Sequence, residues 1–123
     1  MFGRRGEKAG ASESMIESGY RAVWILLMFD LPTDTAKSRK DYTVFRKELL
    51  KDGFSMIQYS VYVRHCASEE NAHVHYERVK NFLPPDGEVR LLIITDKQFE
   101  RMEIYWGKMR KPTPAAPRQL ELF

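Results

Sequence analysis

The chain has 123 residues, enough for one domain with its own hydrophobic core and too few for two domains of ordinary size. Lys and Arg number 20 against 17 Asp and Glu, a mildly basic balance that permits a nucleic-acid partner without requiring one. The one cysteine, Cys66, excludes a disulfide within the chain and a zinc knuckle. A single cysteine fits a reducing cytoplasm, where we expect the protein, and the seven-residue apolar run 23–29 is too short to cross a bilayer, so no membrane contact is expected.

Residues 1–19 are rich in Gly, Ser, Ala, Glu and Arg and predict a flexible N-terminal extension. They contain no apolar segment of the kind that a secretory signal needs. Because Met15 lies shortly before the first apolar run, a translation start upstream of the true one is an equally good explanation for these residues.

The first predicted strand is the apolar run from Val23 to Phe29, which ends on the carboxylate of Asp30. Both faces of this run are apolar, and Pro32 cannot extend a hydrogen-bonded ladder, so the pattern predicts a central strand of a sheet. An acid at the end of a buried strand is a candidate catalytic group. The alternative is that Asp30 accepts backbone hydrogen bonds in the turn that follows.

An amphipathic helix is predicted between the capping residues that precede Ala36 and the glycine at position 53. Its apolar side repeats at spacings of three and four, at Tyr42, Phe45 and Leu49. The opposite side is a cationic ridge, which predicts nucleic-acid contacts from Lys37, Arg39, Lys40, Lys47 and Lys51. The alternative is an ordinary solvated helix face whose charge Asp41 and Glu48 relieve.

Residues 54–64 alternate with a period of two and predict an extended segment. Polar Gln58 and Ser60 near its middle predict a bulge or corner that splits it into two shorter strands. A second helix is predicted from a cap at Ser68 to the Pro84-Pro85 stop.

The segment 88–95 is apolar on both faces and predicts a second central strand beside the first. A turn at Asp96-Lys97 and a last strand over residues 102–106 complete the predicted elements.

The element order predicts an α+β chain with a ferredoxin-like βαββαβ unit and an additional C-terminal strand. Two helices cover one face of such an antiparallel sheet and leave the other face bare. Aromatic and branched residues, including Trp24, Leu26 and Tyr62, are expected on that bare face, so we predict a homodimer that packs sheet against sheet. The predicted division is 1–19 extension, 20–107 ferredoxin-like domain and 108–123 tail.

Motifs for nucleotide hydrolysis, dinucleotide binding and serine hydrolysis are missing from the sequence. The spacing of His65, His73 and His75 is more typical of surface histidines than of a metal site. A twofold axis near the end of the first strand would instead bring two copies of Asp30 together, and the pair could hold Mg²⁺ with waters and phosphate oxygens.

Three segments together carry a family resemblance: Met28-Phe29-Asp30-Leu31-Pro32, the basic helix that ends at Gly53, and Gln58-Tyr59-Ser60-Val61-Tyr62-Val63. Over residues 20–107 the chain resembles the second CRISPR-associated protein family, whose small dimeric members are partners of the spacer integrase. The resemblance implies a ferredoxin-like homodimer with Mg²⁺-dependent endonuclease activity on RNA or double-stranded DNA. Asp30 would be its catalytic and metal-binding residue.

The same resemblance implies a scaffold role, in which the dimer bridges two integrase dimers and holds duplex DNA. We favour the scaffold because each chain offers one well-placed acid, Asp30, and only Asp34 as a nearby candidate base. Where family members carry arginines after the acid, this chain has Lys37, Arg39 and Lys40. A third reading is a toxin-like endoribonuclease that cuts RNA and acts alone.

The predicted tail joins a Pro-rich spacer to the terminal segment Gln119-Leu120-Glu121-Leu122-Phe123. A tethered apolar tip is typical of a docking peptide, with Gln119, Leu120, Leu122 and Phe123 as its contact residues. It resembles the short peptide by which bacterial polymerases bind the sliding clamp. The integrase and the surface of the dimer itself are the alternative docking partners, and they are favoured over the clamp.

Overall fold

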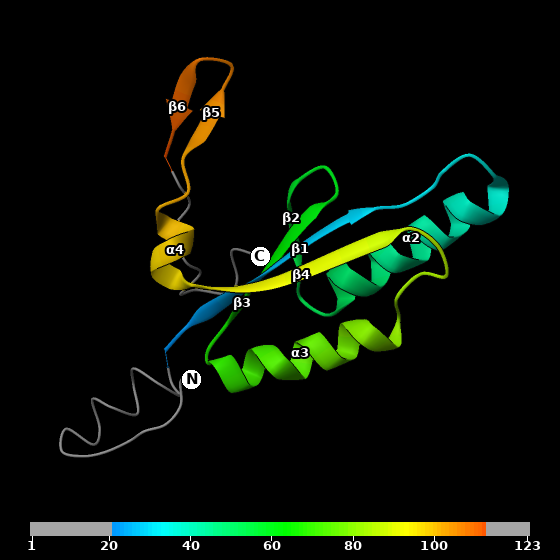
Figure 1. Ribbon diagram of the computed structural model, residues 1–123, viewed down its shortest axis with the longest axis horizontal. Coiled ribbons are helices and arrows are strands. Elements are labelled where there is room, and N and C mark those ends of the chain that lie inside the picture. The colour runs from blue at the N-terminus through cyan, green and yellow to red at the C-terminus, as the bar shows by residue number, and fades with distance from the viewer. Residues whose placement is uncertain (1–20, 113–123) are drawn as a thin grey trace.

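The computed structural model describes residues 21–112 (Figure 1). Its elements are β1 (Val23–Asp30), α2 (Ala36–Lys51), β2 (Ser55–Gln58), β3 (Val61–Cys66), α3 (Glu69–Asn81), β4 (Glu88–Thr95), α4 (Asp96–Glu100), β5 (Ile104–Trp106) and β6 (Met109–Lys111). The first six follow the predicted βαββαβ order. The predicted N-terminal extension and the predicted docking peptide, Gln119 to Phe123, lie outside the described residues.

Strands β1 to β4 form one antiparallel sheet in the order β2-β3-β1-β4, the order of a ferredoxin-like unit. The prediction that β1 is central is confirmed, because it pairs with β3 on one side and β4 on the other. Strand β4 lies beside β1 as predicted, but it is an edge of this sheet rather than a second central strand. Strand β4 is apolar on both faces because Ile94, which pairs with Trp24 on the face away from the long helices, packs in the small cluster around Trp24 and Phe99 of α4.

The predicted split of the extended segment is confirmed between Gln58 and Val61. The β2–β3 register shifts between Met56 and Gln58, and Ser60 adopts a positive φ of 65° in the turn. The backbone oxygen of Ser60 accepts a hydrogen bond of 3.1 Å from the backbone N–H of Phe29. This bond ties the turn to the last residues of β1.

Local capping explains where both long helices begin. Thr35 and Ser38 form a reciprocal capping box at the start of α2, and the Ser68 side chain accepts from the backbone N–H of Asn71 at the start of α3. Both helices pack on the same face of the sheet (Figure 1), and the core between them and the sheet is apolar. Its buried members are Val23, Ile25, Leu27, Phe29, Phe45, Leu49, Phe54, Tyr62, Cys66, Ala72 and Val79.

The opposite face of β1 carries Trp24, Leu26, Met28 and Asp30, which alternate with the core residues. The Trp24 end of this face is covered, because Phe99 of α4 stacks on Trp24 with ring centroids 3.8 Å apart. Towards the other end the face is open, and Leu92 of β4 is 52% exposed. We call this part, defined by Leu26, Met28 and Leu92, the open sheet face.

One predicted member of the bare face was assigned to the wrong side. Tyr62 is 1% exposed and lies in the helix-covered core, because it pairs in register with Leu27 of the core face. The strand split explains the error: the bulge in β2 and the turn at Ser60 interrupt the alternation on which the assignment depended.

The chain after β4 also differs from the prediction. Instead of a turn and one strand, α4 begins at a Thr95 cap, and β5 and β6 then form a hairpin that projects from the sheet (Figure 1). The side chains of Thr95 and Gln98 form a capping box that stabilises this short helix. Residues 109–111, which the sequence places at the beginning of the tail, are the second strand of the hairpin.

Candidate functional site

Asp30 is exposed at the end of β1 and lies on the same side of the sheet as the open sheet face. Its partner in the register is Glu88, the first residue of β4, so the two carboxylates leave the same face. The Asp30 carboxylate has no hydrogen-bond or ion-pair partner within residues 21–112. The alternative reading, in which this carboxylate accepts backbone hydrogen bonds in the next turn, is therefore wrong for these residues.

Gly87 sets how closely the loop before β4 approaches Asp30. A Cβ at this position would lie 2.7 Å from the backbone oxygen of Asp30 and 2.6 Å from Leu31 Cδ2. The φ of Gly87 is +94°, a conformation that strains residues with a side chain. Glycine is therefore required here, and it lets the loop pack directly against the backbone of the candidate catalytic acid.

The donor set for a metal ion is small. Within the described part of the chain, no three His, Cys, Asp or Glu side chains are grouped closely enough to hold a metal ion. Asp30 has no ion-pair partner in the part of the chain that the structure describes, whereas Glu88 accepts a 3.2 Å contact from Arg90 Nη2. Mg²⁺ commonly binds one or two carboxylates and completes its shell with waters and phosphate oxygens, so this set fits Mg²⁺ better than zinc.

The predicted cations of α2 are all exposed, but they are not equivalent. Lys37 forms a 2.9 Å ion pair with Asp41, which raises the pKa of Lys37, and Arg39 donates to the backbone oxygen of Thr33. The other three have no ion-pair partner in residues 21–112, and we call them the lysine row: Lys40, Lys47 and Lys51. Asp41 thus offsets the charge of Lys37, as the solvated-face alternative expects, while no acid within residues 21–112 pairs with the lysine row, so both interpretations of that row stay open.

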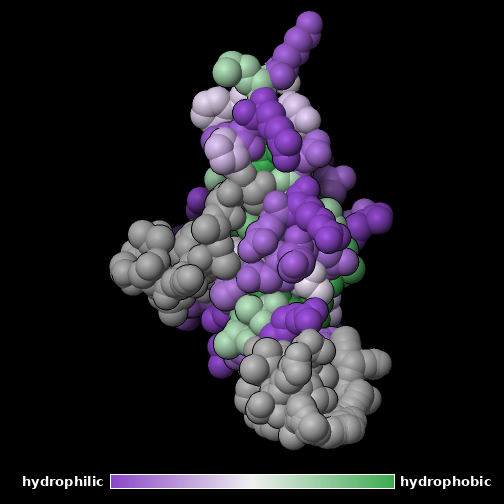
Figure 2. Space-filling view, turned by 90° about the vertical axis from the view of Figure 1, so that its left-hand side faces the viewer, coloured by the Kyte–Doolittle hydropathy of each residue, from purple (hydrophilic) through white to green (hydrophobic). Residues whose placement is uncertain are grey.

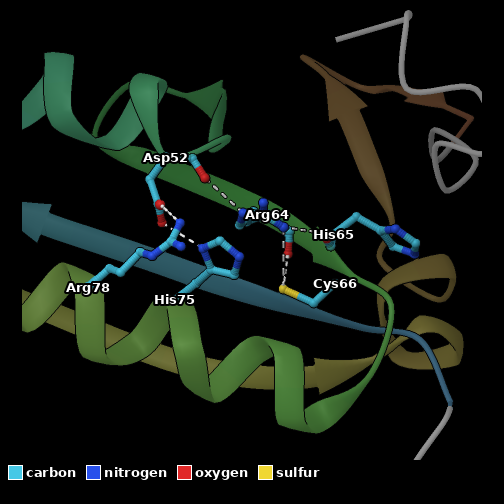
Figure 3. Close-up of polar contacts among 6 residues, drawn as sticks. All are labelled: Asp52, Arg64, His65, Cys66, His75 and Arg78. Carbon is cyan, nitrogen blue, oxygen red and sulfur yellow. Dashed lines mark hydrogen bonds and ion pairs between the residues drawn. The ribbon is translucent and has the colours of Figure 1, made fainter.

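A polar cluster that the sequence did not predict joins α2, β3 and α3 (Figure 3). Asp52 accepts hydrogen bonds from His75 Nδ1 at 2.8 Å and from Arg78 Nη1 at 2.9 Å. Arg64 Nε donates to the backbone oxygen of Asp52 at 2.8 Å. Because these contacts tie the end of α2 to its neighbours, the cluster is structural rather than catalytic.

His75 is 4% exposed, so its interpretation as a surface histidine is wrong. The sequence did contain a sign of this burial. His75 lies three residues after Ala72 and four before Val79, a spacing that places it on the buried side of α3. An ionised carboxylate only accepts hydrogen bonds, so Nδ1 of His75 carries the hydrogen in its bond to Asp52.

A second cluster lies where α4 covers the sheet. Trp24 Nε1 donates a 2.6 Å hydrogen bond to Asp96 Oδ1, and His65 packs edge-on against the Trp24 ring. His65 Nε2 lies 3.8 Å from the same oxygen, which is beyond hydrogen-bond distance. Burial lowers the pKa of His65, and the neighbouring Asp96 only partly opposes this effect. These contacts hold α4 in place.

Comparison with known proteins matches residues 23–102, from β1 to just after α4, to the family model described as CRISPR associated protein Cas2. The chain belongs to the Cas2 family. The match ends before the β5–β6 hairpin. No helix in residues 21–112 combines the length and the apolar composition that a membrane crossing requires.

Several relatives carry the name CRISPR-associated endoribonuclease Cas2. The protein from Parvibaculum lavamentivorans is 60% identical over 101 residues, which cover 82% of this chain and 100% of the relative. The Cas2 protein from Flavobacterium psychrophilum is 55% identical over 104 residues, covering 85% of this chain and 90% of the relative. The Cas2 protein from Paracidovorax avenae is 43% identical over 106 residues, covering 86% and 98%.

Proposed function

We propose that this chain acts as a homodimeric scaffold in CRISPR spacer acquisition, where it holds duplex DNA and bridges two integrase dimers in the cytoplasm. The observation that carries the proposal is the exposed lysine row, which has no ion-pair partner within residues 21–112 and lies on α2, the helix that packs on the sheet face opposite the open one. A dimer that buries the open sheet face therefore leaves both lysine rows exposed to a polyanion.

The position of α4 supports a particular dimer. Because α4 covers the Trp24 end of the sheet, a second copy has room only towards the end that carries Met28 and Asp30. Leu92, 52% exposed, lies within this region. An isologous contact here brings the two Asp30 carboxylates towards the twofold axis.

In that dimer Asp30 of both copies would hold Mg²⁺, and a bound ion would polarise a phosphoryl oxygen and activate a water molecule. The contribution of this chain is to leave the Asp30 carboxylate unpaired at the end of a rigid central strand. Gly87 keeps the neighbouring loop closely packed against its backbone.

The lysine row supports contacts that do not depend on base sequence. From Lys40 to Lys51 it extends for roughly 17 Å along the helix, or about five phosphate steps of one DNA strand. Neutralising phosphates releases counterions, so binding should weaken linearly on a log–log plot against salt.

The scaffold is tested with the lysine row replaced by alanine and the protein mixed with a short duplex and purified integrase. We expect weaker duplex binding, and a salt slope reduced by about 0.9 for each lost phosphate contact. A charge-matched control replaces Lys80, Lys97 and Arg101, which lie on or beside α3 and α4. If both variants lose affinity equally, the lysine row has no special role.

Asp30→Asn separates the scaffold from catalysis. The scaffold predicts that spacer acquisition survives in this variant. If acquisition disappears while dimerisation, DNA binding and integrase binding remain normal, the scaffold-first proposal is wrong.

A second candidate function is Mg²⁺-dependent endonuclease activity, and the unpaired Asp30 carboxylate favours it. The relatives from P. lavamentivorans and F. psychrophilum are named endoribonucleases. An enzyme of this kind should cut RNA with Mg²⁺ and stop after chelation or in the Asp30→Asn variant. The toxin-like version should do so without the integrase.

A further inference from the structure

Strand β4 carries a cation onto the side of the sheet where Asp30 lies. Glu88 pairs in register with Asp30, and Arg90, two residues further along β4, pairs with Met28. Side chains paired in this way leave the sheet on the same side, which here is the side of the open sheet face. The described strands β1 to β4 contain one other lysine or arginine, Arg64, which lies on the helix-covered side. Arg90 is therefore the one lysine or arginine that these four strands place on the side of Asp30.

The ion pairing of these groups is incomplete within one chain. Arg90 Nη2 lies 3.2 Å from Glu88 Oε1, whereas a guanidinium has five N–H donors to offer. The Asp30 carboxylate has no ion-pair partner within residues 21–112. One chain thus leaves an unsatisfied carboxylate and a guanidinium with spare donors on the same side of the sheet.

The proposed dimer contact lies at this end of the sheet. Figure 2 views the molecule from the side on which α4 lies, and hydrophilic side chains make up most of its coloured surface. The apolar residues available to a second copy, Met28 and Leu92, lie directly beside Arg90 in the sheet. In the isolated chain the side chains of Arg90 and Glu88 are 70% and 66% exposed, so a contact here removes charged groups from water.

A twofold axis near Asp30 brings like charges together. Two copies supply four carboxylates, from Asp30 and Glu88, and two guanidinium groups, from Arg90, which leaves two negative charges in excess. The two Asp30 carboxylates repel each other, and each attracts the nearest cation that the other copy offers on this side, which is Arg90. One Mg²⁺ ion carries the charge that balances the excess.

We propose that Arg90 of each chain forms an ion pair with Asp30 of the partner subunit in the metal-free dimer, and that Mg²⁺ replaces this pair. This inference rests on the dimer in the proposed function, and it makes the candidate site incomplete in one chain. Once Mg²⁺ occupies the carboxylates, Arg90 stays beside the ion with its planar donors free for a phosphate group.

A double-mutant cycle on dimer affinity tests the pair. Sedimentation equilibrium of the full-length protein in EDTA should show that Arg90→Gln weakens the metal-free dimer by roughly tenfold or more. In an Asp30→Asn background the same change should weaken the dimer by less than about threefold, because the partner of the guanidinium is already neutral. Arg39→Gln is the matched control, since Arg39 is an exposed arginine on α2, across the sheet from Asp30.

Magnesium titration tests the replacement step. At protein concentrations where wild type and Arg90→Gln are both dimeric, calorimetry should show Mg²⁺ binding roughly tenfold more tightly to Arg90→Gln, because no cation then competes for Asp30. Mg²⁺ should also restore the dimer affinity that Arg90→Gln loses. A purely structural role for Arg90 predicts instead that its loss leaves Mg²⁺ binding unchanged or weaker.

Three results would overturn the inference while the proposed dimer stands. One is a dimer of wild-type affinity for Arg90→Gln, and another is strictly additive effects of Arg90→Gln and Asp30→Asn. The third concerns Leu92→Glu, which places a charge in the apolar contact and should give a monomer. If the coupling between Arg90 and Asp30 persists in the free energy of unfolding of that monomer, the pair forms within one chain.

Failure of the proposed dimer gives a different result. A wild-type protein that stays monomeric with and without Mg²⁺ would contradict the dimer and this inference together.

The duplex-binding test of the lysine row is independent of both, because it involves neither Arg90 nor Asp30.

Discussion

The thiol of Cys66 illustrates how burial controls the reactivity of one side chain. Cys66 is 1% exposed, and this burial raises the pKa of its thiol, although the nearby Arg64 partly offsets the effect. We therefore expect a thiol-reactive disulfide reagent to modify the native protein slowly at mildly alkaline pH and the urea-unfolded protein quickly. With one cysteine in the chain, a single kinetic phase should account for the reaction. Equal reaction rates in the native and unfolded protein would show that the Cys66 thiol is accessible to the reagent in the folded state.

His65 predicts how stability depends on pH. Its pKa is lowered in the folded state, chiefly by burial, so below the ordinary value of about 6.5 the unfolded chain binds more protons. The free energy of unfolding should therefore be insensitive to His65 above that pH and fall as the pH drops below it. The measurement is the urea midpoint at several pH values for wild type and His65→Asn.

The difference in urea midpoint between wild type and His65→Asn at each pH isolates the contribution of His65 from those of the other titrating groups. His73→Asn serves as the control, because His73 is exposed on α3. The interpretation fails if His65→Asn retains the full loss of stability at low pH.

The attachment of α2 to α3 depends on a few polar contacts at the end of α2. Asp52→Ala removes the partner of His75 Nδ1 and of Arg78, and it leaves a buried imidazole N–H without an acceptor. We expect a loss of about 2–4 kcal/mol in the free energy of unfolding, measured with urea. Asp34→Ala, which changes an exposed acid in the loop before α2, should cost far less.

A double variant tests whether the orphaned imidazole is the cause. Asp52→Ala with His75→Leu removes both the acceptor and the buried donor, so it should be more stable than the sum of the two single losses predicts. Strictly additive losses would mean that the two residues act independently.

At the level of the assembled protein, the open sheet face should determine the oligomeric state. Leu92→Glu places a charge in the proposed contact, and sedimentation equilibrium should report a shift from dimer towards monomer. Leu83→Glu is the matched control, because Leu83 is 45% exposed in the loop after α3 and is not one of the residues that define this face. A wild-type monomer, or equal effects of both variants, would contradict the proposed dimer.

The parts of the fold that the sequence predicted are those with a long repeating pattern or a strong cap. Strand β1, helix α2 and the split at Gln58 to Val61 all carry such signals. Helix α4 has five residues, too few to show a helical period, and only the Thr95–Gln98 capping box marks it. Strand β5 lies within the predicted last strand, whereas β6, three residues long, was assigned to the tail because so short a strand shows no alternating pattern.

The sequence predicted which residues belong to the candidate site better than it predicted the contacts that those residues make. A carboxylate after an apolar strand indicated Asp30, and helical spacing indicated the lysine row. Asp41 was expected to relieve the charge of this helix, but the sequence did not show that it pairs with Lys37 and that Lys40 has no ion-pair partner among the described residues. The role of His75 likewise depended on Asp52, a residue 23 positions away that only the fold brings close.

Gly87 has a consequence for how sequence variation in this chain should be interpreted. Because a methyl group there would approach the backbone oxygen of Asp30 to 2.7 Å, most substitutions at position 87 should displace the acid without altering it. A mutational scan that selects for Asp30-dependent activity would then score positions 30 and 87 as similarly intolerant. Intolerance at position 30 would reflect the chemistry of the carboxylate. Intolerance at position 87 would reflect only the steric limit on the loop beside it.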